Sequence, residues 1–227
     1  MKILNRIVVF LLGAAVFPVL ITRDLIRAVV SINQDTSVYK ILSAFMDTID
    51  RKMEITVSIK DAIEFWQSKT FSFGGLDFKI SNLPKDVLIT KNWLIATGVL
   101  VAVAILIAVV IMGCSLFAQA HKTVMGLSAG ALACLFAALK CFGKFAAPFV
   151  DGKIDIGSLI ADNLIKDDAG LIGGIGAAAL KGIIKIDILQ LSSAIFTLAI
   201  IFGIILLWSF AYYITLPEKD RKAKLKK

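Results

Sequence analysis

The stretch WLIATGVLVAVAILIAVVIMGCSLFA, from Trp93 to Ala118, decides the fold because it contains no charged residue. A helix needs about 20 largely apolar residues to cross the hydrocarbon of a bilayer, and this run is longer. Over the whole chain of 227 residues, 58% are hydrophobic and the mean hydropathy is +0.85. That composition is too apolar for a soluble domain, so the sequence predicts a membrane protein.

Three further apolar runs cover Ile7 to Thr22, Thr123 to Leu139 and Leu189 to Thr215. Together the runs predict a mainly α-helical protein with a four-helix transmembrane bundle. Pro18 and the charged pair after Thr22 replace a small-residue cleavage site, so we expect the first run to be a retained signal anchor. The predicted segments are span 1 at 1–22, an outer loop at 23–92, span 2 at 93–118, a turn at 119–122, span 3 at 123–144, a second outer loop at 145–188, span 4 at 189–215 and a basic tail at 216–227.

Charge near the spans predicts the orientation. Lys2, Arg6, Lys122 and the tail carry most of the formal net charge of +8, whereas the two long loops are nearly neutral. Because cytoplasmic segments are enriched in Lys and Arg, we expect a multi-pass plasma-membrane protein with both termini in the cytoplasm. The basic balance needs no nucleic acid, because such a tail is attracted to anionic lipid headgroups.

Aromatic and basic residues also gather near the predicted span ends, where amphipathic side chains favour the membrane interface. Lys140 and Lys144, near the outer end of span 3, either snorkel to the headgroups or face a water-filled path, and we favour the first. The predicted interface residues are Trp93, Lys140, Lys144, Trp208, Tyr212 and Tyr213.

Cysteine and histidine usage is sparse. Cys114, Cys134 and Cys141 lie in or beside spans, so the loops cannot form disulfides, and no Asn-x-Ser/Thr site occurs in the chain. A bacterial or archaeal plasma membrane accounts for both absences. His121 is the only histidine and is interpreted as part of the short inner turn, so we expect neither a metal site nor a cofactor.

The two outer loops are expected to form one small mixed α/β cap. In the first loop, apolar residues from Val38 to Ile49 recur with helical spacing, which predicts a helix that continues span 1 out of the membrane. Strand-like pieces follow at 54–59, 70–73 and 76–80, the last two joined as a hairpin by Gly74-Gly75, and a short helix is expected at 60–67. In the second loop, alternation predicts strands at 153–156 and 183–188, with a helix at 158–165.

Three aromatic residues of the first loop, Trp66, Phe71 and Phe73, are candidates for an interaction surface. Trp66 is either a partner anchor or part of the core of the cap, and we favour the core. The second loop contains a glycine-rich segment marked by Gly170, Gly173, Gly174 and Gly176. It either lies in the interface, enters the bilayer or packs between subunits, or it forms a small-residue helix against the cap.

Small residues recur at intervals of four in span 3, at Gly126, Gly130, Cys134 and Ala138. In lipid, helices associate where small side chains let two backbones approach closely. The pattern predicts a helix-helix contact, and we favour a partner helix from the same chain.

No catalytic motif is present: the chain lacks paired carboxylates at motif spacing, a nucleophile elbow and a phosphate loop. The spans also carry no ionisable residue near the bilayer centre, as a transporter or proton relay would need. We therefore expect a non-enzymatic, self-assembling scaffold or an accessory subunit that contacts itself or another membrane protein through the cap. The alternative is a subunit of an oligomeric pore, lined by the kinked span 1 or by the glycine-rich segment.

The layout of four spans, inner termini and a longer first outer loop with strands resembles that of claudins and other four-span proteins. The resemblance is one of layout only. Trp66 lies in the first loop as a tryptophan does in claudins, but the claudin cysteine pair is absent. No claudin residue is therefore carried over, and the layout favours lateral self-assembly or contact between cells.

Overall fold

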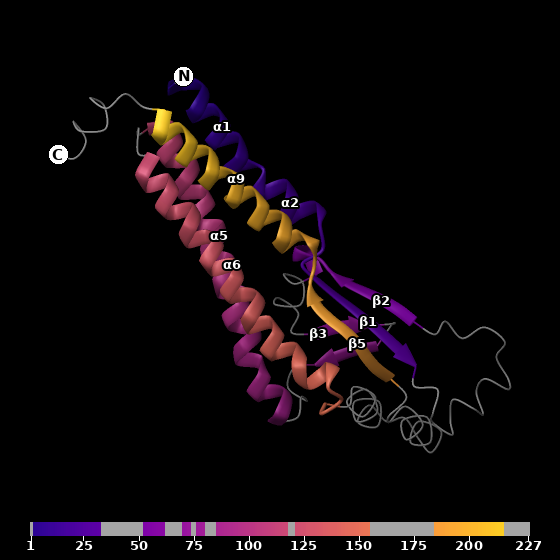
Figure 1. Cartoon of the computed structure of the whole chain (residues 1–227). Helices are drawn as coiled ribbons and strands as arrows, with labels where there is room; N and C mark the ends of the chain where they lie inside the picture. The colour runs from indigo at the N-terminus through magenta and orange to yellow at the C-terminus, as the bar shows by residue number, and fades with distance from the viewer. Residues whose placement is uncertain are drawn as a thin grey trace, which may run out of the picture. The chain divides into compact units, whose positions relative to one another are not determined.

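The computed structural model describes residues 2–32, 52–61, 70–73, 76–79, 85–117, 121–154 and 184–215 (Figure 1). The chain divides into two compact units. The first comprises Met1–Arg23, Thr97–Leu139 and Ser193–Lys227, and the second comprises Asp24–Ala96 and Lys140–Ser192.

Four long apolar helices confirm the predicted bundle. The first span consists of α1 (Lys2–Ala14) and α2 (Val16–Thr22), the second of α5 (Lys85–Phe117), the third of α6 (His121–Val150) and the fourth of α9 (Ser193–Thr215). By length and composition all four can cross a membrane, with mean hydropathies between 1.8 and 3.1 in their most apolar windows.

The first span is interrupted at Ala15, between α1 and α2. Proline has no backbone N–H, so Pro18 cannot donate the bond that a continuous helix would direct to the carbonyl of Ala14. The span ends at Thr22, whose hydroxyl donates to the Pro18 carbonyl over 2.7 Å, and Arg23 is already extended, with φ −119° and ψ 147°.

Packing in the first unit places α1 and α2 alongside α9 (Figure 1). Helix α1 also approaches α5 closely at Gly13, where a Cβ atom would lie 2.8 Å from Cγ of Met112. Large side chains from all four spans are fully buried in this unit: Val16, Ile111, Leu135, Ile195, Leu198, Phe202 and Ile205.

The second unit contains a three-stranded antiparallel sheet in the order β2-β1-β5 (Figure 1). Strands β1 (Ile26–Ile32) and β2 (Lys52–Val57) come from the first loop, and β5 (Ile184–Leu191) comes from the second. The prediction that both loops build one sheet is confirmed. The expected helical continuation of span 1 is wrong, because β1 follows three residues after α2. The helical pattern from Val38 to Ile49 lies outside the described residues.

A β-bulge in β5 reverses the alternation of its side chains between the two faces of the sheet. Val29 pairs with Ile188 and Val30 with Ile186, which leaves Asp187 without a partner in β1. Ile186 is therefore buried at 7% exposure while Ile188 is 44% exposed, although simple alternation would place both on one face. Leu189 then joins Ile186 in a core with Val30, Phe145, Phe149, Val150 and Ile154.

The predicted hairpin is confirmed as β3 (Thr70–Phe73) and β4 (Leu76–Lys79), with Phe73 paired to Leu76. The helix expected at 60–67 is described only at its first turn, from 59 to 61. There Ser58 and Asp61 form a reciprocal cap: the Ser58 N–H donates to the Asp61 carboxylate over 2.8 Å, and the Asp61 N–H donates to the Ser58 hydroxyl over 3.3 Å.

The strand expected at 153–156 is wrong in its described part. Helix α6 continues to Val150 and ends through Gly152, which adopts the left-handed φ of 70° that favours glycine. The Ile154 N–H then donates to the Pro148 carbonyl over 3.0 Å, so Lys153 and Ile154 form a bend rather than a strand. Asp155 and Ile156, like the helix expected at 158–165, lie outside the described residues.

Candidate functional site

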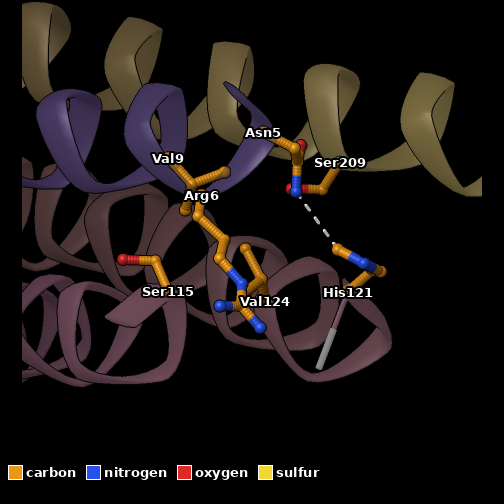
Figure 2. A pocket seen from close by; sticks show the side chains of 7 residues that line it. All are labelled: Asn5, Arg6, Val9, Ser115, His121, Val124 and Ser209. Atoms are coloured by element: carbon orange, nitrogen blue, oxygen red, sulfur yellow. Dashed lines mark hydrogen bonds between the residues drawn. The ribbon is translucent and has the colours of Figure 1, made fainter. Parts of the chain in front are cut away.

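A polar cluster lies at one end of the helices of the first unit (Figure 2). Its residues come from the start of α1, the end of α5, the start of α6 and the last turns of α9. They surround a small cavity and are Asn5, Arg6, Val9, Ser115, His121, Val124 and Ser209. Three of the polar members are buried, with exposures of 4% for Asn5, 5% for Ser115 and 1% for Ser209.

His121 connects three helices within this cluster. The Asn5 amide nitrogen lies 3.2 Å from Nδ1 of His121 (Figure 2), and the imidazole ring lies 4.5 Å from the Tyr212 ring, centroid to centroid. The Asn5 Nδ2–H group donates this hydrogen bond, so Nδ1 of His121 accepts it and the proton of the neutral imidazole is on Nε2. The only histidine of the chain therefore joins the start of α6 to α1 and α9.

Two buried polar atoms of the cluster lack a hydrogen-bond partner among the described residues. They are Oδ1 of Asn5 and the hydroxyl oxygen of Ser209. Buried polar atoms nearly always have partners, and an unpaired one costs about 1–3 kcal/mol. The cavity measures about 10 Å³, roughly the room that one water molecule or one oxygen atom of a larger group requires.

The charge around the cavity is positive. Arg6 extends from α1 toward Val124 of α6 (Figure 2), and none of the lining residues is acidic. Beside the cluster, Nζ of Lys122 lies 5.6 Å from the centroid of the Tyr213 ring. The arrangement combines cationic and neutral hydrogen-bonding groups, which suits a small polar or anionic group rather than a cation.

The sequence did not identify this cluster. The interpretation of His121 as part of a short turn is wrong, because His121 and Lys122 are the first residues of α6. The members come from four different helices, and some lie far apart along the chain: Asn5 and His121 are separated by 116 positions. A single polar residue near each span end was the available signal, and it becomes informative only when the helices are packed together.

The predicted small-residue contact in span 3 has a different environment. A Cβ atom at Gly126 or Gly130 would meet nothing within 4 Å among the described residues. Ala138 is fully buried, whereas Cys134 is half-buried. The buried face of α6 in this unit is instead formed by Val124, Ser128, Ala131, Leu135 and Ala138. Close packing of Gly126 and Gly130 against a helix of the same chain is not observed, and contact with another chain stays a prediction.

Two of the predicted interface residues contact each other in the second unit. Nζ of Lys144 lies 4.3 Å from the centroid of the Trp93 ring, a distance typical of a cation–π interaction. Lys140 is exposed on the same helix. In the first unit, Trp208 is 40% exposed, and Tyr212 and Tyr213 contact His121 and Lys122 as described above.

The remaining candidates cannot be placed. Trp66 and the glycine-rich segment lie outside the described residues, and of Phe71 and Phe73 only the backbone pairing in β3 is described. Within the described ranges, no group of three or more His, Cys, Asp or Glu residues could hold a metal ion.

The four packed apolar helices and the small sheet define the class: a four-span membrane protein. Comparison of the chain with protein-family models, with curated protein sequences and with solved structures gives no match.

Proposed function

We propose that this four-span protein is a non-enzymatic scaffold or accessory subunit that assembles with further copies of itself through the sheet formed by its two loops. The observation that supports this function is the sheet itself. Its outer strands, β2 and β5, each have one edge that no described strand pairs with. Open strand edges present backbone N–H and C=O groups that readily pair with another chain.

Of the two edges, β5 is the better candidate for contact. β2 presents exposed charged residues, and its Glu54 forms an ion pair with Arg27 of β1 at 2.6 Å. Charged side chains on an edge strand discourage pairing with other chains. Strand β5 is eight residues long and carries two charged residues, Lys185 and Asp187, in its first half, but it exposes Ile188 at 44% in its second half. That second half combines an open edge with an exposed apolar side chain.

The alternative function, a pore subunit, gains less support from the spans. Of the two predicted pore linings, the glycine-rich segment lies outside the described residues and the kinked span 1 lies within them. Among the residues of span 1 whose exposure is described, the exposed large side chains are apolar: Ile3, Leu4, Ile7, Leu11, Phe17 and Ile21. Such a face suits lipid, whereas a conducting path requires polar groups along the lining helix.

We also propose a prokaryotic plasma membrane, with both termini in the cytoplasm and the sheet outside. The distribution of Lys and Arg described above supports the orientation, and the lack of loop cysteines and of Asn-x-Ser/Thr sites supports the prokaryotic membrane. The basic tail would then face the anionic headgroups of the inner leaflet.

Replacement of Ile188 by Lys tests the proposal. The side chain is exposed, so we expect the variant to fold and insert normally while its assembly in native-like lipid is lost, because a buried apolar contact is replaced by a charge. Gln190→Lys is the matched control, since Gln190 is an exposed polar residue of the same strand. Equal assembly of wild type and Ile188→Lys, measured by mass photometry in lipid nanodiscs, would refute contact through β5.

The three aromatic residues of the first loop provide a second test of the contact surface. We expect simultaneous replacement of Trp66, Phe71 and Phe73 by Ala to impair assembly without preventing membrane insertion. If neither this variant nor Ile188→Lys changes assembly, the interface between copies lies outside the cap.

A further inference from the structure

We propose that the polar cluster at the end of the helices binds the phosphate group of an anionic phospholipid. The proposal is independent of the assembly function. It rests on the depth of the cluster, its charge, and the two buried polar side chains, Asn5 and Ser209, that line its cavity and have an unpartnered atom.

The depth of the cluster follows from the span ends. Asn5 lies two residues after the start of the first span, Ser115 one residue before the end of the second, and His121 starts the third. Ser209 lies six residues before the end of the fourth span, or about 9 Å at 1.5 Å per residue. All four helices therefore bring these residues close to one membrane interface, where lipid phosphates lie.

The charge of the cluster suits an anion. Arg6 is half-buried beside the cavity and has no acidic partner among the described residues. Its guanidinium carries five N–H donors in a planar fork that matches phosphate oxygens. Lys122, just outside the cavity, adds a second positive charge. Headgroups with a net negative charge are therefore favoured over zwitterionic ones.

The cavity fits one oxygen atom of a phosphate, with the rest of the group outside it. At about 10 Å³ it cannot hold a whole phosphate. The Ser209 hydroxyl, 1% exposed and unpartnered, can donate to that oxygen. A half-turn of the Asn5 amide exchanges its oxygen and nitrogen. Nδ2 can then donate to the anion, and Oδ1 accepts from Nδ1–H of His121, whose ring proton in this state is on Nδ1 instead of Nε2.

This arrangement gives both unpartnered atoms a role. With no anion bound, Oδ1 of Asn5 has no hydrogen-bond partner among the described residues. With an anion bound, the cavity presents only donors, from Ser209, Asn5 and Arg6. Hydrogen bonds from such preorganised donors to an oxyanion are short and strong because the acceptor is charged.

Titration of the purified full chain with phosphatidylglycerol, followed by native mass spectrometry of lipid adducts, tests the site. Wild-type protein should bind phosphatidylglycerol at least about fivefold more tightly than phosphatidylcholine. Both lipids carry the phosphate, but choline adds a quaternary ammonium that the positive charges of Arg6 and Lys122 repel, and one such charge contributes about 1 kcal/mol near a membrane surface. Equal affinity for the two lipids would overturn the proposal and leave a water site. In the second arm, inorganic phosphate is added to protein that has bound phosphatidylglycerol. Retention of the phosphate with loss of the phosphatidylglycerol adduct would identify a soluble phosphate as the ligand and refute the lipid.

Three variants distinguish binding of the lipid phosphate in this cavity from general attraction of anionic lipid to a positively charged surface. Arg6→Gln should weaken phosphatidylglycerol binding at least about tenfold. Lys122→Gln also removes one positive charge, but from beside the cavity. It should weaken phosphatidylglycerol binding by about fivefold or less, the effect of one cation near an anionic surface. Ser209→Ala changes no charge, removes only a hydroxyl, and should still weaken binding roughly threefold or more. Unchanged binding in Ser209→Ala, with an unchanged thermal midpoint, would contradict the site.

Discussion

Replacement of Gly13 by Leu should destabilise the helix bundle. A Cβ at this position would lie 2.8 Å from Cγ of Met112, closer than real Cβ contacts, and 3.6 Å from the Ala108 carbonyl oxygen. Inserting side-chain atoms into a packed interface costs about 1–3 kcal/mol. The added Leu carries three further carbons, so we expect a loss near the upper end of that range.

Gly126→Leu is the matched control. It makes the same chemical change in a membrane helix, but a Cβ there would meet nothing within 4 Å, so the free energy of unfolding of the monomer should be nearly unchanged. The second variant, Gly13→Leu with Met112→Ala, removes the clashing side chain. We expect it to recover at least about 1 kcal/mol relative to the sum of the single changes, because residues in contact couple by about 0.5–3 kcal/mol.

Unfolding by sodium dodecyl sulfate in mixed micelles measures these differences. The native thiols Cys114, Cys134 and Cys141 are half-buried and free, so their reaction with a thiol-sensitive dye reports loss of helix packing. Equal unfolding midpoints for Gly13→Leu and wild type would refute the close approach of α1 to α5. A loss in Gly126→Leu equal to that in Gly13→Leu would instead support a contact at the span 3 glycines.

Four further predictions concern the second unit and the topology. Ser58→Ala should cost about 1 kcal/mol of local stability, as the loss of a helix cap does, and hydrogen exchange at 59–61 should increase. The hydrogen bonds from Ser58 lower the pKa of the Asp61 carboxyl below its ordinary value of 3.8. The ionised carboxyl therefore stabilises the fold above pH 3.8, and this contribution is lost as the pH falls through the lowered pKa of the folded state. Asp61→Asn should accordingly be less stable than wild type at about pH 7 and equal to it in strong acid. In a cysteine-free background, Ser31→Cys with Lys185→Cys should form a disulfide because the two residues are paired in register, whereas Ser31→Cys with Gln190→Cys should not; equal yields would contradict the joining of the loops. Lys153→Cys should react with a membrane-impermeant reagent in intact cells and Lys224→Cys only after lysis, and the reverse pattern would overturn the orientation.

The spans and part of the sheet could be predicted from the sequence because their signals are local. An uncharged run such as that from Trp93 to Ala118 needs no knowledge of its neighbours to predict a membrane helix. The hairpin was also predictable, because Gly74-Gly75 lies between two short alternating segments. Strand β1 was missed because it forms by pairing with β5, more than 150 positions away in the chain. Its content of Ile26, Val29, Val30 and Ile32 was the available signal.

The helix contacts and the polar cluster depend on packing that a single sequence does not contain. Small residues at Gly126 and Gly130 indicated a contact face, yet the buried face of α6 follows Ser128 and Leu135. The close approach occurs instead at Gly13, within the small-residue run Gly13-Ala14-Ala15 of the first span. Likewise, the bulge at Asp187 exposes Ile188, which alternation alone would bury. Each case depends on a partner element far away in the chain.

Imaging of single particles of the full chain in native-like lipid tests the central claim most directly. We expect discrete assemblies in which neighbouring copies meet at the sheets formed by their loops, with no opening along the helices. The Ile188→Lys variant should give single copies under the same conditions. A closed ring of helices around a central opening would contradict the scaffold function and support the pore.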